Sequence, residues 1–86
     1  MEYKIAIVQQ LSSLLKSMRK QSGLTQKEMG NKLGVSQRVF ARNETNPEKV
    51  HFERVLQILS ELDADLIIRE RKGKSPNNSS LDEEPW

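Results

Sequence analysis

Cysteine is absent from the 86 residues of this chain, and only four of its residues are aromatic. Without cysteine the chain can hold neither a disulfide framework nor a thiolate metal site, which suits a reducing cytoplasm. The single histidine, His51, is too little for a zinc site or a Ser-His-Asp arrangement. No apolar run approaches the roughly 18 residues of a membrane span, and the first residues lack the pattern of a secretory signal. We therefore expect one small cytoplasmic domain with a single core.

The charge of the chain is distributed unevenly, although its sum is only +2. Residues 16–42 hold seven bases and one acid, a local charge of +6, whereas residues 43–86 hold ten acids and six bases. A basic excess of this size is typical of a surface that binds a polyanion, and the alternative is a solvated helix face. The seven bases are Lys16, Arg19, Lys20, Lys27, Lys32, Arg38 and Arg42.

Apolar spacing predicts two long amphipathic helices, over residues 7–22 and 51–62. In the first, Lys16, Arg19 and Lys20 fall off the apolar stripe, and Gly23 follows the last turn as a cap residue. The stripe of the first helix consists of Leu11, Leu14, Leu15 and Met18. The stripe of the last helix consists of Phe52, Val55, Leu56, Ile58, Leu59 and Leu62.

Two N-cap residues predict two short helices between the long ones. Thr25 with Glu28 three residues later forms a capping box and opens a helix over residues 25–33. Gly34 stops that helix, and Ser36 caps the next one, over residues 36–44. The chain therefore reads as mostly α.

Residues 64–71 form the only strand candidate in the chain, because Leu66, Ile67 and Ile68 are adjacent, apolar and flanked by charges. The backbone N–H and C=O groups of a strand need hydrogen-bond partners. The simplest partner is the same strand of a second copy, antiparallel across a two-fold axis. The alternative is an extension of the last helix. We expect a DNA-binding and dimerisation domain over residues 1–72 and a disordered tail over residues 73–86, which ends in Trp86.

The small and apolar residues around the predicted turn indicate a helix-turn-helix. Counting from Gln26, glycine falls at the fifth position (Gly30) and the ninth (Gly34), and a large apolar residue, Phe40, falls at the fifteenth. Gly30 lets two helices cross closely, Gly34 supplies the left-handed backbone of a sharp turn, and Phe40 anchors the underside of the second helix. In this motif the second helix enters the DNA major groove.

Geometry then predicts which side chains contact DNA. The exposed face of the second helix carries the base-reading candidates Gln37, Arg38, Ala41 and Arg42. Glutamine suits adenine, arginine suits guanine, and alanine offers a methyl contact to thymine. For Arg38 and Arg42 the alternative is a phosphate contact. The candidates for phosphate binding lie at the two helix starts, where the helix dipole favours an anion: Thr25, Gln26, Lys27 and Ser36.

Two runs in the chain carry a resemblance to a known family. The segment GLTQKEM at residues 23–29 and the segment LGVSQ at residues 33–37 resemble the XRE/Cro-type helix-turn-helix family, to which phage repressors belong. The run NPEKV at residues 46–50, the leucine-rich last helix, the strand-like segment and a polar tail ending in tryptophan are similar to HipB-type antitoxins. The resemblance covers nearly the whole chain. One departure is Asn43, which stands where the family places a core residue, so it either caps the recognition helix locally or ends it early.

The resemblance implies a lambda-repressor-like fold of four to five helices, with one short C-terminal β-strand that pairs across a homodimer through Leu66, Ile67 and Ile68. It also implies a transcriptional repressor that binds a near-palindromic operator of its own operon and acts as antitoxin toward a HipA-type serine/threonine kinase. Two alternatives stay open: a stand-alone phage-type repressor, and an interaction subunit whose main role is to bind a protein partner. We expect no enzymatic activity, no cofactor and no metal.

Overall fold

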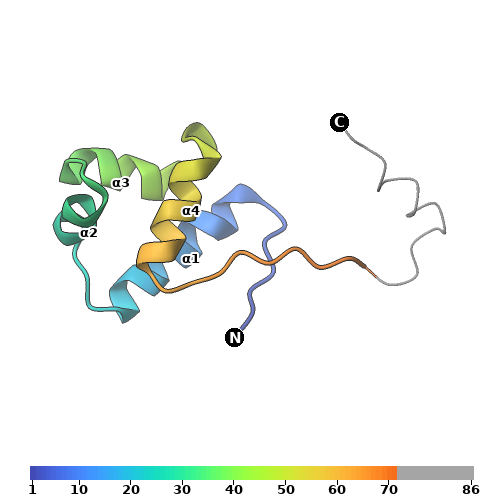
Figure 1. Cartoon of the computed structure of the whole chain (residues 1–86). Coiled ribbons are helices and arrows are strands. Elements are labelled where there is room, and N and C mark those ends of the chain that lie inside the picture. The colour runs from blue at the N-terminus through green and yellow to red at the C-terminus, as the bar shows by residue number, and fades with distance from the viewer. Residues whose placement is uncertain (72–86) are drawn as a thin grey trace.

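The computed structural model describes residues 1–71, so the predicted tail over residues 73–86 and Trp86 lie outside the described residues. Four α-helices and one 3-10 helix follow one another in this part of the chain (Figure 1). They are α1 (Val8–Gln21), α2 (Gln26–Leu33), α3 (Gln37–Thr45), η1 (Pro47–Lys49) and α4 (Phe52–Glu61). The four helices predicted from the sequence are confirmed, each to within one residue at either end, and the predicted mostly helical fold is confirmed with them.

Helix ends follow the local signals in the sequence. Gly23, just after α1, takes the left-handed φ of +75°, as expected of a residue beyond a helix C-terminus. Asp63, just after α4, also takes a positive φ of +61°, a conformation that aspartate tolerates better than most residues. The left-handed residue at this position redirects the chain out of α4 into the segment over residues 64–71.

The core lies where the four helices meet. Each of the first three helices supplies one fully buried apolar residue to the core: Leu15 of α1, Met29 of α2 and Phe40 of α3. Helix α4 and its C-terminal residue supply the remainder of the core: Val55, Ile58, Leu59 and Leu62. Phe40 packs in this shared core with residues of the other three helices, and this packing fixes the orientation of α3.

The sequence prediction for the inner face of α4 is wrong at two positions. Phe52 and Leu56 were expected in the core, but 62% and 41% of their surfaces are exposed. Val55, Ile58, Leu59 and Leu62 already follow the i, i+3, i+4, i+7 pattern of one face. Phe52 and Leu56 lie one turn apart on an adjacent edge, which the other helices of residues 1–71 do not cover.

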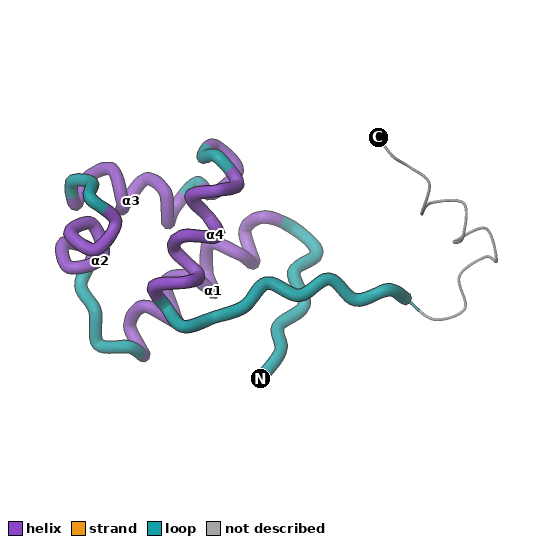
Figure 2. Tube along the Cα trace, viewed as in Figure 1, coloured by secondary structure: helices purple, strands orange, loops and turns teal. Residues whose placement is uncertain are grey.

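Residues 64–71 have no regular secondary structure, and no strand occurs anywhere in residues 1–71 (Figure 2). The segment leaves α4 as an extended stretch and passes the N-terminal segment, to which Arg69 is joined by an ion pair with Glu2 at 3.2 Å. A strand that pairs only with a second copy has no ladder within one chain. The strand pairing across a homodimer therefore stays a prediction.

Candidate nucleic-acid interface

The turn between α2 and α3 depends on two glycines. Gly34 takes a left-handed φ of +76°, and nothing lies within 4 Å of the position that its Cβ would occupy. Gly30, in contrast, lies in a crowded position, since a Cβ there would lie 2.8 Å from the carbonyl oxygen of Val35. The prediction for Gly34 is confirmed. The close approach at Gly30 is confirmed too, but it brings the helix against carbonyls of the turn that follows, which holds α3 at a fixed angle to α2.

Both helices of the motif begin with the predicted caps. Thr25 Oγ1 accepts a hydrogen bond from the Glu28 amide at 3.0 Å, and Glu28 Oε1 accepts one from the Thr25 amide at 2.8 Å. Ser36 Oγ accepts a hydrogen bond from the Val39 amide at 3.1 Å. These bonds use a lone pair of each hydroxyl but leave its hydrogen available for donation. A phosphate oxygen can therefore still accept a hydrogen bond from Thr25 and from Ser36.

The side chains of α3 divide into an inner and an outer set. Phe40, Asn43 and Glu44 are buried, at the i, i+3 and i+4 positions of one face. The outer set holds the four base-reading candidates, of which Gln37, Arg38 and Arg42 are exposed and Ala41 is half-buried. The structure therefore brings the four predicted residues together on the solvent side of one short helix.

A buried ion pair that the sequence analysis missed lies beneath the motif. Arg19 Nε donates to Glu44 Oε2 at 2.7 Å, and Arg19 Nη2 donates to Glu44 Oε1 at 3.2 Å. Only 10% of the Arg19 side chain and none of the Glu44 side chain is exposed. Arg19 Nη1 also donates to the carbonyl oxygen of Leu24 at 2.9 Å, just before the first cap. The pair thus joins α1, the start of α2 and the end of α3.

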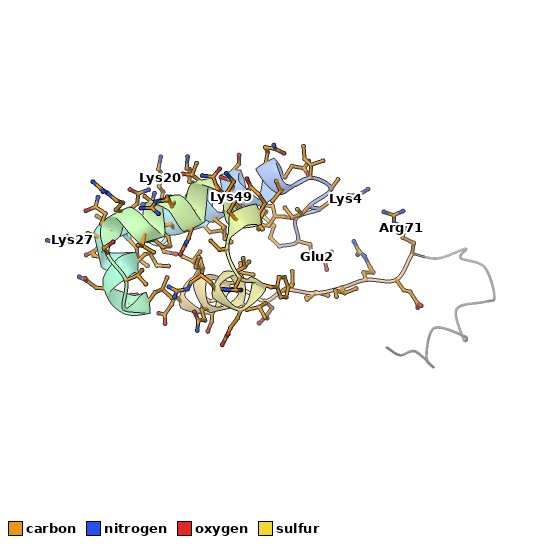
Figure 3. All side chains as sticks on the ribbon, turned by 90° about the horizontal axis from the view of Figure 1, so that it is seen from above. Glu2, Lys4, Lys20, Lys27, Lys49 and Arg71 are labelled. Carbon is orange, nitrogen blue, oxygen red and sulfur yellow. The ribbon has the colours of Figure 1, made fainter. Side chains whose placement is uncertain are left out.

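Arg19 is therefore not one of the bases offered to a polyanion, which corrects its place in the predicted basic surface. A signal for this existed in the sequence, because Arg19 follows the buried Leu15 by four residues and so lies on the same face of α1. The other six bases of residues 16–42 are all exposed. Figure 3 places one of them, Lys27, at the end of the molecule opposite Glu2 and Lys4.

Gln26 is positioned by the same buried pair. Its Nε2 donates to Glu44 Oε1 at 3.1 Å, and the residue is half-buried at the first position of α2. An amide nitrogen has two hydrogens and Gln26 uses one of them here, so the other hydrogen and the start of the helix remain for an anion. The predicted phosphate-binding residues Thr25, Gln26 and Lys27 thus lie at one helix start. Thr25 and Lys27 are exposed and Gln26 is half-buried.

Asn43 behaves differently from both alternatives offered by the sequence. Helix α3 continues past it to Thr45, so the helix does not end early. Asn43 is buried, and its Oδ1 has no hydrogen-bond partner among the described residues. The same is true of Nη1 of Arg54, which borders the same open hollow between α3 and the start of α4. Arg42 consequently lies within a regular helix, together with the other base-reading candidates.

The predicted dimerisation residues lie at the other end of the molecule. Leu66, Ile67 and Ile68 are exposed, with 91% of the surface of Ile68 accessible. Among residues 1–71 there is no group of three or more His, Asp or Glu side chains placed to hold a metal ion. None of the helices within the described part of the chain is both long and apolar enough to cross a membrane.

Comparisons with known proteins identify related chains. No protein-family model matches this chain. The protein named Antitoxin HipB of Escherichia coli strain K12 is 29% identical over 83 residues, which are 96% of this chain and 94% of that protein. A solved HipA-HipB-O2-O3 complex contains a chain that is 30% identical and superposes with a TM-score of 0.73, over 83% of this chain and 100% of that one.

This chain belongs to the HipB family of antitoxins. A second solved structure, a HipB-O1-O2 complex, contains a chain with 29% identity and a TM-score of 0.72, over 80% of this chain and 100% of that one. The HipB chains in these complexes are matched over their whole length. The HipB fold therefore accounts for the full helical part of this chain, which confirms the family resemblance inferred from its motifs.

Proposed function

We propose that this chain is a sequence-specific DNA-binding repressor and the antitoxin of a HipA/HipB-type system, and that it binds a near-palindromic operator of its own operon as a homodimer. The observation that carries the proposal is the outer face of α3, where Gln37, Arg38 and Arg42 are exposed together on a helix held by a cap, a glycine turn and a buried ion pair. The relatives support it, since HipB chains of the same fold occur in complexes with O1, O2 and O3, which we interpret as operator DNA.

The base contacts follow from the chemistry of that face. Gln37 can bond bidentately to the N6 and N7 atoms of adenine, and Arg38 and Arg42 can each bond to O6 and N7 of guanine. Ala41 is half-buried between them and offers only its methyl group. Backbone phosphates are held by Thr25, Gln26, Lys27 and Ser36, at the starts of α2 and α3. The phosphate contacts fix the register of the domain, and the α3 contacts select the sequence.

A homodimer would present two such faces to half-sites one helical turn apart. We propose that the exposed residues Leu66, Ile67 and Ile68 pair as antiparallel strands across the two-fold axis and that residues 1–72 form the dimerising unit. Replacing Ile67 or Ile68 by lysine would introduce a charge into this contact. We expect both variants to sediment as monomers at concentrations at which the wild-type chain is a dimer; an unchanged dimer in both would reject this interface.

The partner other than DNA is a HipA-type serine/threonine kinase. The support is that a relative matched over its whole length occurs in a complex with HipA, and the expected place of action is the cytoplasm, where the DNA lies. We assign this chain no reaction of its own and no cofactor. Co-purification with the kinase of the same operon, and loss of its toxicity on co-expression, would support the antitoxin role. Normal operator binding without any kinase binding would instead identify a stand-alone repressor.

The DNA-binding role is tested by titrating the promoter of the gene itself against a scrambled duplex of equal length. Specific binding should reach a dissociation constant of about 10⁻⁸ M or lower at physiological salt. The logarithm of affinity should fall with the logarithm of salt concentration by about 0.9 for each phosphate contacted. Micromolar binding that is indifferent to sequence would reject the specific repressor and favour the interaction subunit.

A further inference from the structure

The N-terminal segment, residues 1–7, carries apolar side chains that no other part of residues 1–71 covers. Tyr3, Ile5 and Ile7 alternate with Glu2, Lys4 and Ala6, and in an extended chain alternate residues share one side. Their exposed surfaces are 50%, 41% and 58%. This is the period of a half-buried strand, so residues 64–71 are not the only strand candidate in the chain.

The two candidate strands lie next to each other. Residues 1–7 cross the segment over residues 64–71 in Figure 1, and the ion pair between Arg69 Nη1 and Glu2 Oε1 joins them. The backbone of residues 1–5 and 65–71 makes no hydrogen bond within the part of the chain that the structure describes. Even so, the apolar side chains of both segments remain exposed. Contact between these two segments therefore does not bury either set.

An open hollow and protruding side chains complement each other at this end of the molecule. The hollow, of about 370 Å³, lies between the N-terminal segment and α1. Tyr3, Ile5 and Leu14 form its apolar part, and its polar rim consists of Lys4, Gln9, Gln10 and Ser13. The protruding side chains are Ile67 and Ile68, which are 69% and 91% exposed. Burial of an isoleucine side chain is favourable in proportion to the apolar area removed from water, so a contact that covers both sets at once is favoured.

We propose that the N-terminal segment is a second part of the dimer interface, and that its Tyr3-Ile5-Ile7 face and the hollow beside it receive Ile67 and Ile68 of a second copy of this chain. The inference rests on the homodimer proposed above and adds an element to it. A strand pair formed by two copies of residues 64–71 leaves two outer edges free. Residues 1–7 of the two copies are placed to cover those edges, which would protect them from further pairing.

Because the chain lacks cysteine, single cysteines report this contact cleanly. The Ile5→Cys and Ile67→Cys variants are mixed, allowed to exchange subunits, oxidised, and analysed by intact mass after non-reducing electrophoresis. We expect a covalent heterodimer with one chain of each variant. Lys32→Cys, at an exposed position of α2, serves as the matched control in place of Ile5→Cys and should give no heterodimer with Ile67→Cys.

Sedimentation equilibrium gives a second readout. Ile5→Lys should weaken the dimer at least about ten-fold, because a charge would enter an apolar contact. Lys32→Glu, at an exposed position of α2 away from the hollow, should change it less than about two-fold. A dimer of normal affinity in Ile5→Lys, together with Ile67→Cys homodimers but no heterodimer, would overturn this inference and leave the proposed homodimer intact. Absence of any covalent dimer would overturn both. An intrachain disulfide as the sole product of the double variant Ile5→Cys and Ile67→Cys would also overturn the inference.

Discussion

Two ion pairs within residues 1–71 lie at opposite ends of the molecule, and the two ends differ in how far the described residues bury their own side chains. Arg19 and Glu44, beneath the helix-turn-helix, are buried, joined at 2.7 Å and tied to Gln26 and Leu24. Arg69 and Glu2, at the terminal segments, are 78% and 69% exposed at their side chains. At the first end the charged pair is buried by the helices around it. At the second end apolar side chains are exposed among the described residues, as at an interface with another molecule.

The largest effect should come from breaking the buried pair. Glu44→Ala leaves the Arg19 charge and the Gln26 amide without their acceptor, and we expect a loss of about 3–5 kcal/mol in the free energy of unfolding, measured by urea titration. The matched control is Glu2→Ala at the exposed pair, which should cost less than about 1 kcal/mol. Equal small losses in both variants would show that the two ends do not differ in this way.

The turn provides the next test. Gly30→Ala places a methyl group 2.8 Å from a backbone oxygen, and overpacking of this kind should cost about 1–3 kcal/mol in the same measurement. Gly34→Asn is the control, because its Cβ meets open space and asparagine tolerates a positive φ. We expect only a small loss there. A Gly30→Ala variant as stable as the wild type would mean that the turn does not need this close approach.

A comparison of Arg38→Ala with Lys27→Ala separates the base contacts of the DNA-binding end from its phosphate contacts. Removing a base contact should cost about 1–3 kcal/mol of discrimination at one base pair and leave the fold intact. Removing a phosphate contact should weaken binding to every sequence and reduce the salt slope by about 0.9. Both are measured by titrating the operator and a set of single-base variants. Uniform weakening by Arg38→Ala would reassign that residue to phosphate binding.

The smallest effect is expected at the first cap. Thr25→Ala removes the hydroxyl that accepts from the Glu28 amide and should cost about 1 kcal/mol of stability. Ser17→Ala, at an exposed position within α1, is the control and should be neutral or slightly stabilising, since alanine is the better helix former. A Thr25→Ala variant that matches this control would show that the cap contributes nothing to α2.

Most of the fold was predictable because its signals are local. The caps at Thr25 and Ser36 and the left-handed Gly34 set the helix boundaries from within a few residues. The buried pair was not predictable in the same way, because Arg19 and Glu44 are 25 residues apart and only the packing of α1 against α3 brings them together. Arg19 also lies within a strongly basic stretch, so the sequence indicated an exposed charge at this position.

The outer face of α3 was predictable as a set, since helical periodicity separates Gln37, Arg38 and Arg42 from the buried Phe40. The exposure of Phe52 and Leu56 was not predictable, because a wide apolar stripe does not show which edge its own chain leaves uncovered. The apolar alternation at Tyr3, Ile5 and Ile7 is present in the sequence but too short to predict a strand by itself. Its proposed role in the dimer depends on residues 64–71, which only the folded chain places beside it.

The most direct test of this division is an amide NMR titration of the full chain with its operator duplex. We expect the largest chemical-shift changes at the start of α2 (residues 25–27) and along the start and outer face of α3 (residues 36–42), with residues 1–7 and 64–71 unaffected in the preformed dimer. Dilution toward monomer, without DNA, should shift the two terminal segments instead. Operator-induced changes confined to the terminal segments, with α3 unperturbed, would contradict the account.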